Sequence, residues 1–207
     1  MLSPMSLGAT IVAVVATSAV GYLVGSVPVA NLVAARRADL DLRTVGDRNP
    51  GYWNAKETLG RRRAVPVFVG DVAKGAAGAG LGIVLAGDGQ WWMAYIGAGA
   101  AMVGHAFPVF AGFRGGRSVL AFVGGALVFT PVAALIAVGV LILAMIGTRR
   151  FAVGARAGIV ALPFVQIVVD GPYRTAATGA LMTFIGLRFV QAAMVSRTHG
   201  PATSDDG

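Results

Sequence analysis

The 207-residue chain contains no cysteine and only two histidines, and charged residues make up just 13% of it. The lack of cysteine excludes disulfide frameworks, thiol nucleophiles and cysteine-ligated zinc or iron–sulfur centres. Soluble domains carry about 25% charged residues, so this scarcity of charge excludes an ordinary water-soluble fold. Hydrophobic residues make up 56% of the chain, and its mean hydropathy is +0.74. This composition excludes a disordered, nucleic-acid-binding tail and predicts an integral membrane protein with no nucleic-acid partner.

Seven apolar runs predict an all-α protein with about seven transmembrane helices. A spanning helix needs roughly 20 apolar residues, which the first three runs and the last one supply. The fourth run is short, but joining it to the fifth would give about 45 Å of helix in a hydrocarbon core of about 30 Å. Thr130 and Pro131 also favour a break there. The runs cover residues 7–34, 64–86, 91–111, 118–129, 131–147, 158–169 and 175–195.

The formal charge of +8, from 17 Lys and Arg against 9 Asp and Glu, predicts the orientation in the membrane. Basic residues concentrate on cytoplasmic loops. Seven spans with the N-terminus outside and the C-terminus in the cytoplasm place fourteen basic residues inside. We therefore expect one polytopic domain over residues 1–197 and a disordered tail over 198–207. The fourteen residues are Arg36, Arg37, Arg43, Arg48, Lys56, Arg61, Arg62, Arg63, Arg114, Arg117, Arg149, Arg150, Arg156 and Arg197.

Lys74 lies well inside the second run, where an ionisable side chain is costly and often functional. Asp71 lies three residues earlier, on the same face of a helix. Two interpretations remain open, a neutralised structural pair and a contact with substrate. Glycines at positions 70 and 75 would let a ligand approach the backbone, which slightly favours the second interpretation.

The sequence between the third and fourth runs is typical of an anion site. Arg114 and Arg117 flank Gly115 and Gly116, whose backbone N–H groups can close on phosphate oxygens, and a helix is expected to begin near Ser118. A cytoplasmic basic turn is the alternative, although it explains the arginines and not the paired glycines. His105, near the end of the third run, is either a packing residue or the one conventional base candidate. No metal site is expected.

The longest loop covers residues 35–63 and is rich in glycine, asparagine and proline. These residues predict a compact, hydrogen-bonded loop over 45–57 rather than a helix. Tyr52 and Trp53 are suited to the membrane interface. A plain basic linker is the alternative interpretation.

Four motifs together resemble those of the PlsY-type bacterial acyl-phosphate:glycerol-3-phosphate acyltransferases. They are residues 25–28 (GSVP), 49–51 (NPG) followed by Asn54, 71–75 (DVAKG) and 104–117 (GHAFPVFAGFRGGR). The resemblance covers roughly residues 20–120. It implies a seven-helix bundle in the bacterial inner membrane with its active site facing the cytoplasm.

The resemblance also implies a reaction. A fatty acyl group would pass from acyl phosphate to the 1-hydroxyl of glycerol 3-phosphate, giving lysophosphatidic acid and inorganic phosphate without a metal or another cofactor. Lys74 would neutralise developing charge, and His105 would assist proton removal or position groups. Asn49 and Asn54 would orient the acceptor. The expected catalytic residues are Lys74, His105 and Asn54, and the expected substrate-binding residues are Ser26, Asn49, Gly51, Arg114, Gly115, Gly116 and Arg117.

Several positions depart from the family pattern, and they keep a second function open. The chain could be a non-catalytic relative that binds a phosphorylated lipid or organises a membrane partner. A transporter is disfavoured because no internal repeat is visible, and the oligomeric state stays open. The departures are Asp47-Arg48 in place of Ser-Gly, Tyr52-Trp53 in place of Ala-Thr, Glu57 in place of arginine, Ser118 in place of glycine, residues 149–152 (RRFA) in place of a serine-containing motif, and Phe189 and Ala192 in place of the His-x-x-Asn of the last span.

Overall fold

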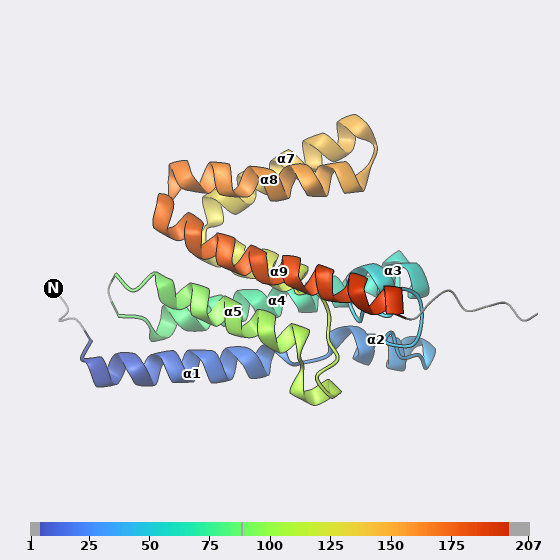
Figure 1. Ribbon diagram of the computed structural model, residues 1–207, viewed down its shortest axis with the longest axis horizontal. Coiled ribbons are helices and arrows are strands. Elements are labelled where there is room, and N and C mark those ends of the chain that lie inside the picture. The colour runs from blue at the N-terminus through green and yellow to red at the C-terminus, as the bar shows by residue number, and fades with distance from the viewer. Residues whose placement is uncertain (1–4, 88, 199–207) are drawn as a thin grey trace, which may run out of the picture.

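A computed structural model describes residues 5–87 and 89–198, and within these ranges the chain forms helices and no strand (Figure 1). Its elements are α1 (Leu7–Gly25), α2 (Val29–Ala38), α3 (Tyr52–Leu59), α4 (Arg61–Leu85), α5 (Trp92–Ala106), the 3-10 helix η1 (Val109–Ala111), α6 (Val119–Phe129), α7 (Pro131–Thr148), α8 (Phe151–Val169) and α9 (Pro172–Thr198). The expected tail lies outside the described residues except for Thr198, which ends α9.

Six helical segments within the described ranges are long and apolar enough to cross a membrane, and α6 is a shorter apolar helix of 11 residues. Together they account for the seven predicted apolar runs, and the all-helical membrane fold is confirmed. The predicted break is also confirmed, because α6 ends at Phe129 and α7 begins at Pro131. Thr130 makes the turn, and its hydroxyl hydrogen-bonds the Asp170 carboxylate at the α8–α9 turn.

Several predicted boundaries were wrong. The first run divides into α1 and α2 at residues 26–28, because Pro28 has no N–H to continue the helix and restricts the residue before it. The sixth run begins at Phe151 rather than at residue 158. This earlier start includes Arg156, whose exposed long side chain allows its charge to leave the apolar environment.

Small residues bring α4 and α5 into close contact, as expected in a membrane protein. A Cβ atom added at Gly78 would lie 2.4 Å from the carbonyl oxygen of Gly97, and one added at Gly82 would lie 2.1 Å from that of Met93. Each glycine therefore packs directly against the backbone of the neighbouring helix. This close packing fixes α4, which carries Lys74, against α5, which carries His105.

A buried cluster joins this pair to the later helices. The rings of Tyr95 on α5 and Phe129 on α6 stack with centroids 4.1 Å apart. Gln166 on α8 donates a hydrogen bond of 2.9 Å to the Tyr95 hydroxyl. The α7–α8 hairpin projects away from the α1, α4 and α5 layer in Figure 1.

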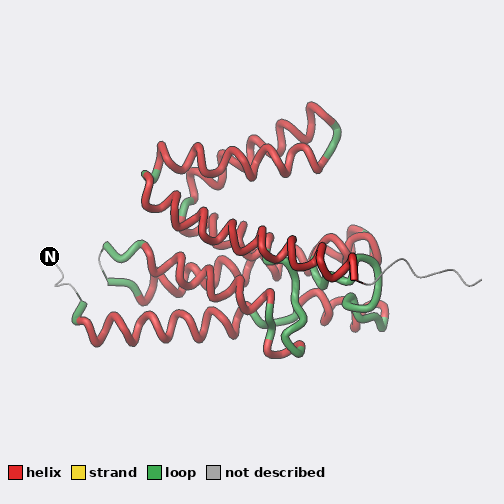
Figure 2. Tube along the Cα trace, in the orientation of Figure 1, coloured by secondary structure: helices red, strands yellow, loops and turns green. Residues whose placement is uncertain are grey.

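The connections gather at the two ends of the bundle (Figures 1 and 2). The beginning of α1, the α4–α5 connection and the α8–α9 turn lie at one end. Helices α2 and α3 and the C-terminal end of α9 lie at the other. The long loop predicted over residues 45–57 is helical from Tyr52 onward, where α3 begins after Gly51. The prediction of a compact loop therefore holds only for its first part.

Candidate active site

Three ionisable side chains meet in the interior. The Nζ atom of Lys74 lies 2.9 Å from Oδ1 of Asp71, and Nδ1 of His105 lies 3.4 Å from the same oxygen. All three side chains are at most 6% exposed. Lys74 also donates a hydrogen bond of 3.2 Å to the carbonyl oxygen of Val27, at the break between α1 and α2. The ion pair considered for Asp71 and Lys74 is present, and His105 contacts the same carboxylate oxygen.

This cluster opens into a narrow pocket between α2, α4, the end of α5 and the loop that precedes α6. Lys74 and Arg114 contribute cationic side chains to the pocket lining, and Asp71 lies between Lys74 and His105. Asn31 also lines it, and its buried Oδ1 atom has no hydrogen-bond partner. The lining residues are Gly25, Val27, Pro28, Val29, Ala30, Asn31, Pro50, Asp71, Lys74, His105, Pro108, Arg114, Gly115 and Gly116.

The N–H groups of the paired glycines, which were predicted to bind phosphate, donate hydrogen bonds within the chain in this structure. The N–H of Gly115 donates to the carbonyl of Ala106 at 3.2 Å, and that of Gly116 donates to His105 at 3.1 Å. These bonds satisfy carbonyls at the C-terminus of α5, so neither N–H is free for phosphate in this structure. A Cβ atom at Gly116 would lie 2.3 Å from Nε2 of His105. The glycines thus allow the loop to pack against the imidazole.

The two arginines of this loop differ in their surroundings. Arg114 is exposed and lines the pocket. Arg117 is partly buried, and its Nη1 atom forms an ion pair of 3.3 Å with Asp47. Its guanidinium also lies over the ring of Phe189 on α9, 4.9 Å from the centroid. Ser118 precedes α6 as predicted, and its hydroxyl donates to the carbonyl of Met102.

Arg188 on α9 holds the same loop from the other side. Its Nη2 atom lies 3.3 to 3.4 Å from the carbonyl oxygens of Ala106, Gly115 and Gly116. Its guanidinium lies 4.6 Å from the centroid of the Phe107 ring. Arg188 was not among the predicted site residues, and its one signal in the sequence is a charged side chain inside the last apolar run, residues 175–195.

The remaining predicted site residues lie outside the pocket lining. The buried Asn54 amide donates 2.9 Å hydrogen bonds to the carbonyls of Leu42 and Val45 and accepts one from Thr58. In this structure the Asn54 amide holds the loop between α2 and α3, and its role in orienting a substrate stays a prediction. The Ser26 hydroxyl is buried and donates to the carbonyl of Tyr22.

The motif residues Asn49 and Gly51 surround Pro50, which does line the pocket. The N–H of Asn49 donates to Oδ1 of Asp47 at 3.1 Å. Gly51 precedes α3, and a Cβ atom added there would lie 3.1 Å from Nδ2 of Asn49.

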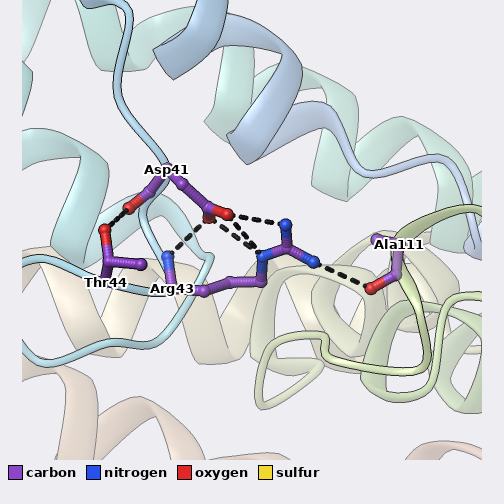
Figure 3. A network of polar contacts seen from close by, with 4 residues as sticks. All are labelled: Asp41, Arg43, Thr44 and Ala111. Carbon is purple, nitrogen blue, oxygen red and sulfur yellow. Dashed lines mark hydrogen bonds and ion pairs between the residues drawn. The ribbon is translucent and has the colours of Figure 1, made fainter.

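A further arginine, missed in the sequence, anchors the loop between α2 and α3 (Figure 3). Arg43 donates several hydrogen bonds to Asp41, the shortest at 2.6 Å, and one of 2.9 Å to the carbonyl of Ala111 in η1. The hydrogen bonds from Arg43 hold the pKa of Asp41 below its usual range. The contact joins two segments 68 residues apart, so local sequence gave no sign of it.

The fold is that of a helical integral membrane protein of known architecture. It matches a crystal structure of PlsY, an integral membrane glycerol 3-phosphate acyltransferase, in its glycerol 3-phosphate form, with a TM-score of 0.76 over 90% of this chain and 92% of that chain. The sequence identity is 24%. The lysophosphatidic acid form of PlsY matches with a TM-score of 0.69 over 89% of this chain and 93% of that one, at 22% identity.

The sequence places the chain more narrowly. The glycerol-3-phosphate acyltransferase family model matches residues 15–199. Glycerol-3-phosphate acyltransferase 5 of Dehalococcoides mccartyi is 37% identical over 80% of this chain and 72% of its own length. The glycerol-3-phosphate acyltransferase of Rhizobium etli is 31% identical over 98% of this chain and 96% of its own. The chain belongs to the glycerol-3-phosphate acyltransferase family, as the motifs predicted.

Proposed function

We propose that this protein transfers a fatty acyl group from acyl phosphate to the 1-hydroxyl of glycerol 3-phosphate, forming lysophosphatidic acid for phospholipid synthesis. Membership of the glycerol-3-phosphate acyltransferase family supports this activity. The observation that carries the assignment to this site is the meeting of Lys74, His105 and Arg114 in one narrow pocket. The cationic side chains of Lys74 and Arg114 suit a reaction between two phosphate-bearing substrates, acyl phosphate and glycerol 3-phosphate.

The chemistry needs little beyond positioning and charge. The hydroxyl oxygen attacks the acyl carbon, a new ester C–O bond forms, and the C–O bond to phosphate breaks as inorganic phosphate leaves. The hydroxyl proton passes to His105 or to the departing phosphate. Lys74 and the loop arginines stabilise the negative charge that develops on the oxygens, which is commonly the largest catalytic contribution in acyl transfer. Because acyl phosphate is already activated, orientation supplies much of the remaining rate.

We further propose that the pocket faces the cytoplasm of a bacterial inner membrane. The pocket lies beside the basic loops, and loops rich in arginine stay on the cytoplasmic side. Arg174 occupies the first turn of α9, at the opposite end of the bundle. Labelling of cysteines introduced at positions 48 and 174 in intact cells tests this orientation, since only position 174 should react from outside.

Arginine substitutions test the site. Arg114→Ala and Arg117→Ala should each raise the KM for a phosphate-bearing substrate at least tenfold, because a charge-assisted contact is lost. Arg61→Ala, at the start of α4 and outside the pocket lining, is the matched control and should change the KM little. Equal effects of all three substitutions would argue against a local phosphate site. Binding without turnover in the purified wild type would favour the non-catalytic relative instead.

A further inference from the structure

In the loop that precedes α6, Arg117 already has an anionic partner, because it forms an ion pair with Asp47. Asp47 lies in the loop between α2 and α3, and Oδ2 is 3.3 Å from Nη1 of Arg117. Its other oxygen, Oδ1, accepts a hydrogen bond from the N–H of Asn49 at 3.1 Å. The loop backbone therefore holds one carboxylate oxygen and leaves the other directed at the guanidinium.

This carboxylate pairs with a guanidinium group that is also suited to binding a phosphate. Guanidinium groups bind carboxylates and phosphates through the same N–H donors. The ring of Phe189 covers one side of the Arg117 guanidinium, and the Nε atom of Arg117 is buried without a hydrogen-bond partner. The Arg117 side chain is 27% exposed, and its Nη1 atom is the one that faces Asp47.

Resting on the function proposed above, we propose that Asp47 is a tethered competitor that occupies Arg117 until a substrate phosphate displaces it. A phosphate carries more negative charge than one carboxylate, so it can replace Asp47. The pair is partly exposed, with the Asp47 side chain 38% accessible, and such pairs are weak enough to exchange. Asp47 therefore raises the KM for the substrate whose phosphate binds at Arg117.

Asp47→Asn isolates the charge. The amide oxygen of asparagine still accepts the hydrogen bond from Asn49, while the negative charge is removed. The KM for glycerol 3-phosphate or for acyl phosphate should fall about two- to fivefold, which corresponds to the strength of an exposed ion pair. The kcat should stay within the error of the wild type. The substrate whose KM falls is the one whose phosphate binds at Arg117.

Asp39→Asn is the matched control. Asp39 lies at the C-cap of α2 with a φ of 51°, a conformation that asparagine tolerates, and it is exposed. The Asp39→Asn substitution removes one negative charge from the same loop and leaves the Asp47–Arg117 ion pair in place. An unchanged or higher KM for both substrates in Asp47→Asn would overturn the proposal, and so would an equal fall in Asp39→Asn.

A binding measurement separates this proposal from the proposed function. Inorganic phosphate, titrated into purified protein in detergent, should bind about two- to fivefold more tightly to Asp47→Asn than to the wild type. If the wild type makes no lysophosphatidic acid, the proposed function fails, and this titration alone decides the role of Asp47. Equal affinities for phosphate would refute the competition.

Discussion

Replacing Lys74 should show how strongly the free energy of unfolding depends on the contacts among Lys74, Asp71 and His105. Lys74→Met keeps a long side chain but leaves the Asp71 carboxylate, 2% exposed, without its cation at 2.9 Å. Breaking a buried pair in this way typically costs about 3–5 kcal/mol, because the remaining charge is uncompensated. His105 remains 3.4 Å from the same oxygen. The Val27 carbonyl loses the hydrogen bond from Lys74 and keeps the one from the Val29 N–H.

The double variant Asp71→Asn with Lys74→Met gives the decisive comparison. It contains no unpaired buried charge, and replacing both partners of such a pair is often nearly neutral. It should therefore recover most of the lost free energy of unfolding, with a coupling between the two sites of at least about 1 kcal/mol. SDS-induced unfolding in mixed micelles, followed by tryptophan fluorescence, measures this.

Activity provides the second readout of the same variants. Both Lys74→Met and the double variant should lose at least about a hundredfold in kcat, because the cation that stabilises developing charge is absent from each. A double variant no more stable than Lys74→Met would refute the coupling. Full activity in the double variant would refute the catalytic role of Lys74.

Three further predictions concern packing, the loop and pH. Gly75→Val should lower the free energy of unfolding, measured in SDS, by about 1–3 kcal/mol, because a Cβ atom there would lie 1.8 Å from the carbonyl oxygen of Ala121. The control Gly80→Val should leave this free energy unchanged, because a Cβ atom at Gly80 has no neighbour within 4 Å. Arg188→Met should raise the KM for the substrate bound at the loop that precedes α6 more than it lowers kcat. Arg188→Lys should bring the KM part of the way back to the wild-type value. A fall in kcat alone would argue for a different role of Arg188. Because the pKa of Asp41 is lowered, its stabilising contribution is complete above the ordinary carboxylate pKa of about 4 and is lost only as the pH falls through the lower folded value. Hydrogen exchange of residues 40–48 should therefore show equal protection at pH 7 and pH 5 after correction for intrinsic rates, and Asp41→Asn should reduce protection at both.

Local sequence patterns predicted the features that depend on nearby residues. The spacing of Asp71 and Lys74 placed both on one helical face, and Thr130-Pro131 correctly predicted the break between α6 and α7. Each of these follows from helix geometry or from the missing N–H of proline.

Long-range contacts could not be predicted in the same way. His105 reaches Asp71 only because α4 and α5 pack closely, and Arg188 reaches the glycine loop from 72 to 82 residues away. The use of the Gly115 and Gly116 N–H groups depends on how the chain leaves α5. The helical part of the long loop was missed because α3 is stabilised by packing on α4 rather than by its own composition.

Product formation by the purified protein tests the central claim most directly. Wild-type protein in detergent or liposomes, given acyl phosphate and labelled glycerol 3-phosphate, should produce lysophosphatidic acid and inorganic phosphate in equal amounts. The Arg114→Ala, Arg117→Ala double variant should produce far less at the same substrate concentrations. A wild-type yield of lysophosphatidic acid no higher than that of a protein-free control would contradict the assignment.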